Sequence, residues 1–429
     1  MSLPHPRTAR RVLCLALLVF GFAAAGRAQP ALRFAKPEQV GLSSERLARL
    51  SAHMRSYVES GKLAGIVTLV ARRGRIAALE AFGAQDLASG SAMQPDSLFR
   101  IYSMTKPITS VAVLQLYEEG RLLLGDPVAK HVPELAGLRA LERPDAPLSK
   151  TRALERPPTI RDLLTHTAGF VYDFTATGPL AQAYRDAGIL GSMSTLSPKA
   201  WIERLARLPL AHQPGRIWNY GVSDDVLGYV VQSVSGMPFD AFLRARLFAP
   251  LGMHDTDFSV PESKHERFAA LYAPGPDGEL VPSERDLGTR YHEPPSFPSG
   301  GGGLVSTAAD YWRFDQMLLD GGAFAGTRVL SPKTVELMTA NALSAEERKG
   351  FVWMPGNGFG LGVSVLDDLG ASAALGSAGS FGWGGAAGTI QWVDPQEELI
   401  AILMIQITPP DAYPIQSEFR ALVYQAIED

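Results

Sequence analysis

Ser103 and Lys106 stand three residues apart in the segment FRIYSMTKPITSVAV, residues 99–113. Side chains with this spacing on a helix project from the same face, so the hydroxyl and the amine would lie about one turn apart. A serine hydroxyl is a weak nucleophile until a base takes its proton, and a lysine amine serves as that base only when burial or nearby positive charge disfavours its charged form. The apolar residues that follow Lys106 would provide such burial. The spacing alone leaves two interpretations open: a nucleophile with its base, or a helix cap followed by a lysine in solvent.

The segment around Ser103 resembles the active-site helix of the serine β-lactamase and penicillin-binding-protein superfamily, whose signature is S-x-x-K. Further segments follow in the order of the landmarks of the class C-like branch, so that the resemblance covers roughly residues 35–425. These segments are RDLLTHTAGF (161–170), PGRIWNYGVSDDVLGYVVQSVSG (214–236), PSGGGGLVSTAADYWRF (298–314) and FGWGGAAGT (381–389). Five ordered segments favour the interpretation as a nucleophile with its base.

The resemblance implies a role for each residue that stands at a motif position. Ser103 would be the acylated nucleophile and Lys106 its proton partner, while Tyr220 would act with the lysine as general base and then as general acid to the leaving group. The backbone N–H groups of Ser103 and Ala386 would form the oxyanion hole. A structural alternative stays open for Tyr220, namely a buried aromatic residue beside Trp218.

Two positions depart from the class C pattern. The tyrosine motif of that branch is Y-x-N, but Val222 stands where the asparagine would be. Trp383, Gly384 and Gly385 replace the lysine-threonine-glycine triplet, so an apolar ring takes the place of the cation that pairs with a substrate carboxylate. We expect Val222, Trp383, Gly384 and Gly385 to contact the substrate. A site with these residues should bind neutral, short-acyl substrates better than penicillins. The pattern resembles that of the β-lactamase-like carboxylesterases of family VIII.

We therefore expect a serine hydrolase that cleaves short-acyl carboxylic esters through an acyl-serine intermediate, without metal or cofactor. One alternative is a β-lactamase or D-alanyl-D-alanine carboxypeptidase, and an alternative of another class is a non-catalytic relative that binds cell-wall peptide. A Ser-His-Asp mechanism through His166 is not favoured, because the chain contains no G-x-S-x-G motif, and we expect a structural role for this histidine. Arg290, His292 and Asp310 are candidates for lining the cleft, but we expect that they hold the neighbouring loop and helix.

Helix and strand patterns at the two ends of the chain predict one shared sheet. Residues 43–61 have the apolar spacing of an amphipathic helix, and residues 64–83 have the pattern of a β-hairpin. Short β-like runs and a final helix lie near the C-terminus. We expect an α/β (α+β) fold in which an antiparallel sheet flanked by helices is built from residues 29–115 and 300–429, with a mostly helical domain, residues 116–299, inserted beside it.

Residues 1–28 have the features of a secretory signal peptide. Arginines precede the apolar run 12–25, which is too short for a lasting membrane span and is followed by small residues. The alternative is an N-terminal anchor that is never cleaved. Cleavage would leave 36 basic and 44 acidic side chains, a net charge of about −8, which argues against nucleic acid or an anionic membrane as partner. We expect a periplasmic or secreted protein that acts on a small-molecule ester.

The composition excludes thiol chemistry in the mature chain. The sole cysteine, Cys14, lies within the expected signal peptide, so no disulfide or thiolate ligand would remain. The eight histidines are scattered and form no H-E-x-x-H pattern, so no metal site is expected. The hexapeptide RALERP occurs at 139–144 and again at 152–157, which indicates a local duplication in a surface loop. The oligomeric state does not follow from these patterns.

Overall fold

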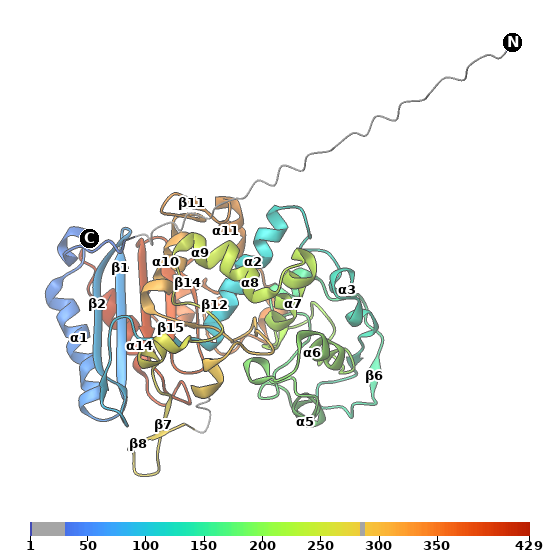
Figure 1. Ribbon diagram of the computed structural model, residues 1–429, viewed down its shortest axis with the longest axis horizontal. Helices are drawn as coiled ribbons and strands as arrows, with labels where there is room; N and C mark the ends of the chain where they lie inside the picture. Colours follow the sequence, from blue (N-terminus) through green and yellow to red (C-terminus); the bar gives the residue numbers. More distant parts are fainter. Residues whose placement is uncertain (2–30, 284–287) are drawn as a thin grey trace.

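The computed structural model describes Met1, residues 31–283 and residues 288–429, and its architecture is shown in Figure 1. Apart from Met1, the signal peptide expected over residues 1–28 lies outside these described residues. Within the described ranges, no helix combines the length and the apolar character needed to cross a lipid bilayer.

The largest sheet joins the two ends of the chain, as the sequence patterns predicted. Among the described residues it contains eight strands, each antiparallel to its neighbours, in the order β12-β13-β14-β15-β16-β1-β2-β3. The first hairpin therefore lies directly beside the last one, with Val67 opposite Met404. The strands are β1 (Gly65–Arg72), β2 (Arg75–Asp86), β3 (Ser91–Ala92), β12 (Asn357–Phe359), β13 (Ser364–Leu366), β14 (Phe381–Gly384), β15 (Ile390–Asp394) and β16 (Leu399–Met404).

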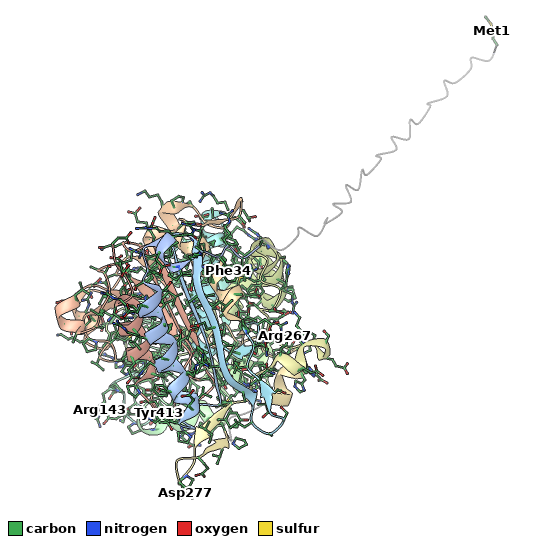
Figure 2. The ribbon with its side chains drawn as sticks, turned by 90° about the vertical axis from the view of Figure 1, so that its left-hand side faces the viewer. Met1, Phe34, Arg143, Arg267, Asp277 and Tyr413 are labelled. Carbon is green, nitrogen blue, oxygen red and sulfur yellow. The ribbon has the colours of Figure 1, made fainter. Side chains whose placement is uncertain are left out.

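Both faces of this sheet are covered by helices. Along β16, odd-numbered residues pack into the apolar core beneath α1 (Ser44–Glu59) and α14 (Ile415–Tyr424), and even-numbered residues pack into the core beneath α10 (Ala308–Leu319). This follows from the two-residue period of a strand, and it explains why the sequence of β16 is apolar throughout. Figure 1 shows α1 on the outer side of the sheet, and Figure 2 shows it running lengthwise along the strands.

The amphipathic helix expected over residues 43–61 is confirmed as α1. Ser43 is its N-cap and accepts a hydrogen bond from the backbone N–H of Arg46, which satisfies one of the amides that the first turn leaves unpaired. The buried side chains of α1 recur at the expected spacing of three and four residues: Leu47, Leu50, Met54 and Tyr57.

The middle of the chain is mostly helical. Much of it lies on the side of α2 (Thr105–Glu118) away from the sheet, and its last helices lead back towards α10 (Figure 1). It includes α3 (Val128–His131), α4 (Ile160–Leu164), α5 (Gly178–Asp186), α6 (Pro198–Leu205), α7 (Ser223–Ser235), α8 (Phe239–Leu243) and α9 (Ala249–Leu251). One apolar core extends from the inner sheet face through α2 into these helices. The boundaries of the helical domain stay a prediction, because this core passes through both parts.

The chain returns from the helical region beside the point where it left. Strand β4 (Phe99–Arg100), just before Ser103, pairs with β9 (Val305–Ser306), just after the glycine run. This pairing brings the start of α2 next to residues 299–303. The two RALERP copies also meet, because β5 (Ala140–Leu141) pairs with β6 (Thr151–Arg152).

Candidate active site

Ser103 lies in a tight turn that precedes α2 rather than in the helix itself. The 3₁₀ turn Tyr102–Met104 leads into α2, so the helix begins at Thr105, two residues after Ser103. Tyr102 has a φ of 39°, a left-handed conformation that residues other than glycine rarely adopt. The Tyr311 hydroxyl donates to the carbonyl of Met104 over 2.7 Å and so fixes the far side of the turn.

The hydroxyl of Ser103 lies between an amine and a phenol. Lys106 Nζ is 3.1 Å from Ser103 Oγ, and the Tyr220 hydroxyl oxygen is 2.7 Å from the same atom. Lys106 is fully buried, so the alternative of a lysine in solvent is wrong. The capping alternative is also wrong, because Met104 is the N-cap of α2 and no side chain caps that end. The three side chains that the sequence singled out are thus in direct contact.

The loop before α7 holds the Tyr220 ring against its neighbours. The N–H of Asn219 donates to the carbonyl of His166 over 2.8 Å, and the Thr175 hydroxyl donates to the carbonyl of Tyr220 over 2.7 Å. Gly221 lies so close to the chain that an added Cβ would come within 2.3 Å of the carbonyl oxygen of Phe170. Glycine is therefore required at the residue after the tyrosine.

Trp383 makes a contact that the sequence did not reveal. Its indole Nε1 lies 3.3 Å from the Tyr220 hydroxyl oxygen, to which it donates a hydrogen bond. This second bond fixes the position of the phenol oxygen. The tryptophan that replaces the family lysine therefore contacts the proposed base through a polar group as well as an apolar ring.

Lys106 is held by a backbone carbonyl and by two aromatic rings. Its Nζ donates to the carbonyl of Gly301 over 2.5 Å and lies 4.6 Å from the ring centre of Tyr220 and 5.2 Å from that of Tyr172. An added Cβ on Gly301 would come within 2.7 Å of both Asp225 Oδ2 and the Tyr172 hydroxyl. The glycine run is thus needed for close packing at this carbonyl.

Asp225 also holds the glycine-containing loop 299–303 in place. Its Oδ1 accepts hydrogen bonds from the Ser299 hydroxyl over 2.5 Å and from the N–H of Gly301 over 3.1 Å. Burial raises the pKa of this carboxyl from 3.8 to about 6, although its bond to Ser299 and the charge of Lys106 act in the opposite direction. Sequence reasoning missed Asp225; its place on the first turn of α7, five residues after Tyr220, was the available signal.

The raised pKa predicts a pH-dependent contribution of Asp225 to stability. The folded carboxyl keeps its proton up to about pH 6, whereas the unfolded one loses it near 3.8, so this stabilisation is complete below pH 3.8 and is lost as the pH rises through 6. The free energy of unfolding of the wild type should therefore fall by roughly 3 kcal/mol relative to Asp225→Asn between pH 3 and pH 7. Denaturant unfolding of both proteins at several pH values measures this difference, and a difference that stays constant with pH would contradict the assignment.

His166 lies behind the ring of Tyr220 and makes no contact with Ser103 Oγ. Its ring centre is 4.9 Å from that of Tyr220, and its Nε2 lies 3.1 Å from Asp224 Oδ2, with both side chains buried. Burial lowers the pKa of His166 even though Asp224 acts in the opposite direction. Since the partners of Ser103 Oγ are Lys106 and Tyr220, the structure agrees with a structural role for this histidine.

A cavity of about 310 Å³ opens over Ser103. The exposed residue Ala386 lies on its wall, in the turn that the N–H of Gly385 closes by donating to the carbonyl of Thr389 over 2.7 Å. Val222 is not brought to the cavity, because it is fully buried at the start of α7. The remaining wall comes from Tyr102, Tyr172, Asp173, Phe174, Leu190, Gly191, Ser192, Met193, Leu271, Arg290, Tyr291, Ser299, Gly301, Gly302 and Thr408.

The three residues expected to be structural have different positions. Asp310 is buried and its Oδ2 accepts the N–H of Asp255 over 2.7 Å, which is a structural role as expected. His292 stacks on His265 with 3.8 Å between ring centres, away from the cavity wall. Arg290 holds a neighbouring loop through its bond to the carbonyl of Ser194, as expected, and it also lines the cavity together with Ser103.

Comparison with known proteins decides the family. The sequence profile of the Beta-lactamase family matches residues 50–425. The chain belongs to this family. An uncharacterized protein of Mycobacterium tuberculosis is 39% identical over 83% of this chain and 89% of its own length. Esterase EstB of Burkholderia gladioli is 34% identical over 83% of this chain and 89% of its own length. The solved structure of EstCE1, a hydrolase with promiscuous acyltransferase activity, has a TM-score of 0.78 and 26% identity over 88% of this chain and 98% of that one.

Membership of the Beta-lactamase family agrees with the observed fold. The antiparallel sheet, its flanking helices and the helical region beside it have the arrangement of the β-lactamase and transpeptidase fold. The esterase relative and the hydrolase neighbour place the chain near the carboxylesterases of this family. The chain is accordingly a serine hydrolase.

Proposed function

We propose that the chain hydrolyses carboxylic esters with short acyl groups through an acyl-serine intermediate. The observation that carries this proposal is the position of Ser103 Oγ, which lies between the Tyr220 hydroxyl at 2.7 Å and Lys106 Nζ at 3.1 Å on the wall of the cavity. A hydroxyl in hydrogen-bond contact with an amine and a phenol, two groups that can exchange protons with it, and open to a substrate-sized space has what nucleophilic catalysis requires.

In the acylation step, Ser103 Oγ attacks the ester carbonyl as its proton passes to Tyr220 and Lys106. The carbonyl π electrons move to the oxygen, and the backbone N–H groups of Ser103 and Ala386 stabilise that oxyanion. When the tetrahedral intermediate collapses, the bond to the alkoxy oxygen breaks, and the proton returns through Tyr220 to release the alcohol. The acyl group is then bonded to Ser103.

In the deacylation step, water takes the place of the alcohol. Tyr220 and Lys106 remove a proton from water as it attacks the acyl carbonyl, and the proton is returned to Ser103 Oγ when the acid leaves. The Trp383 indole donates to the Tyr220 oxygen and stabilises the negative charge that this oxygen carries as a base. No cofactor takes part in either step.

The esterase proposal is supported over β-lactam hydrolysis by the residues around Tyr220. Trp383 stands where the family has the lysine that pairs with a β-lactam carboxylate, and its side chain is directed to the tyrosine. The relative EstB is named an esterase. The signal-like sequence of residues 1–28 supports the further proposal that the enzyme acts in the periplasm or outside the cell.

A comparison of two substrates tests the proposed function. We expect kcat/KM for 4-nitrophenyl butyrate to exceed that for a chromogenic cephalosporin by about a hundredfold or more, because the site has lost two groups that bind a β-lactam. Both reactions are followed by absorbance with the same purified protein. A cephalosporin hydrolysed as fast as the ester would favour a β-lactamase, and the absence of both reactions would contradict the proposal.

A further inference from the structure

The cavity above Ser103 contains an arginine that has no carboxylate partner among the described residues. Arg290 is a half-buried residue of the 3₁₀ turn Gly288–His292, and its side chain lines the cavity that Ser103 and Ala386 also line. One hydrogen bond holds it, from Nη2 to the carbonyl of Ser194 over 2.8 Å. Within the described part of the chain, no carboxylate lies within ion-pair distance of Arg290.

A half-buried arginine that does have a carboxylate partner is Arg267. Its Nη2 lies 2.8 Å from one carboxylate oxygen of Asp255, and its Nη1 donates to the other over 3.0 Å. Burial disfavours the charge of both arginines, but the bonds to Asp255 leave the pKa of Arg267 raised, whereas the pKa of Arg290 is lowered. Arg290 therefore carries an electrostatic cost that an anion in the cavity would offset.

The one acidic side chain on the described cavity wall is already engaged. Asp173 lies 3.6 Å from Arg185, at ion-pair distance, and so its charge is balanced from outside the cavity. Other parts of the wall are apolar, with Phe174, Leu190 and Met193 exposed there. A guanidinium presents planar paired donors that match a carboxylate, and partial removal from water strengthens that contact.

We propose that Arg290 binds a carboxylate of the substrate, so that the preferred esters are short and carry a negative charge, as half-esters of dicarboxylic acids do. This inference rests on the proposed ester hydrolysis and specifies its substrate class. It replaces the expectation of a neutral substrate, which followed from the loss of the lysine triplet. Trp383 of β14 stands where the family has a lysine, but Arg290 of the turn 288–292 supplies a positive charge to the cavity above Ser103.

Matched pairs of esters test this subsite. Monoethyl glutarate is compared with ethyl pentanoate for a carboxylate on the acyl side, and 3-acetoxypropanoate with propyl acetate for a carboxylate on the alcohol side. Hydrolysis is followed by proton release in a pH-stat. In at least one pair, kcat/KM for the charged ester should exceed that for the neutral ester by about ten- to a hundredfold, the range expected of a charged hydrogen bond.

Variants show whether Arg290 causes the preference. Arg290→Gln should bring the ratio of charged to neutral kcat/KM to about one, and Arg290→Lys should keep part of it, because lysine retains the charge but not the paired donors. Arg143→Gln removes the same charge from an exposed site outside the cavity and should leave the ratio as in the wild type. Should Arg290→Gln fail to fold, two other measurements decide. One is the ratio of charged to neutral kcat/KM in Arg290→Lys, and the other is the decrease of the wild-type ratio with added salt.

Two outcomes would overturn the subsite: a ratio of about one or lower for both pairs in the wild type, or a ratio that Arg290→Gln leaves unchanged. Calorimetric binding of glutarate separates this inference from the proposed function, because it requires no turnover. Glutarate that binds the wild type and not Arg290→Gln supports the subsite even if neither ester is hydrolysed, which would contradict esterase activity alone. Ester hydrolysis without charge preference and without glutarate binding would contradict the subsite alone.

Discussion

Replacement of Ser103 by alanine should reduce the turnover of a short-chain chromogenic ester by about 10⁴-fold or more. The substitution removes the oxygen that attacks the ester carbonyl, and neither Lys106 nor Tyr220 can take its place, because both act on the proton of that oxygen in the proposed mechanism. Initial rates of 4-nitrophenyl butyrate hydrolysis by the purified variant provide the measurement. The residual rate should not exceed that of a sample inactivated by heat.

Ser110→Ala is the matched control for this variant. Ser110 lies on the same helix, α2, is fully buried, and its hydroxyl has no hydrogen-bond partner among the described residues. Loss of this hydroxyl should leave the rate within about twofold of the wild type, since it breaks no bond. A Ser103→Ala protein that keeps a rate similar to that of Ser110→Ala would show that the nucleophile has been assigned to the wrong residue.

Replacement of Tyr220 by phenylalanine should lower kcat by about 10²- to 10⁴-fold, the range that general acid–base catalysis contributes. This change removes the hydroxyl that lies 2.7 Å from Ser103 Oγ and leaves the ring, which packs against Trp218 and Trp353, in place. The expected loss is in kcat rather than KM, because the hydroxyl moves a proton in the transition state. Steady-state kinetics with 4-nitrophenyl butyrate separate the two constants.

Two comparisons make the result for Tyr220 specific. Tyr184→Phe removes another fully buried tyrosine hydroxyl, on α5 and outside the cavity wall, and should keep kcat within about twofold. A double variant, Tyr220→Phe with Lys106→Met, should lose little more activity than the more damaging single variant, because residues that act as a unit have non-additive effects. Independent, multiplying losses would instead contradict a shared proton path.

The contact between Ser103 and Lys106 was predictable because the chain itself fixes it. A spacing of three residues at the start of a helix brings the two side chains together whatever the rest of the fold does. The sheet was also predictable, because the first and last strands are apolar and each must be buried by pairing with other strands. The sequence did not reveal the 3₁₀ turn that precedes Thr105, because the left-handed residue of this turn, Tyr102, is not a glycine.

The parts of the site that the sequence did not predict depend on how distant segments meet. The bond from Trp383 to Tyr220 depends on the distance between β14 and the loop before α7, which residue types do not set. Val222 follows Tyr220 by two residues, but the chain has already entered α7 there and buries this side chain. Arg290 reaches the cavity from a loop whose path has no periodic pattern, so its charge was visible in the sequence but its position was not.

The most direct test of the proposed mechanism is to locate the covalent adduct. A fluorophosphonate reacts with an activated serine and forms a stable bond, so that intact-protein and peptide mass spectrometry can count and locate the label. We predict one phosphonyl group per chain, bonded to Ser103, and none on the Ser103→Ala protein. An unlabelled wild-type protein, or a label bonded to any residue other than Ser103, would contradict the assignment of Ser103 as the nucleophile.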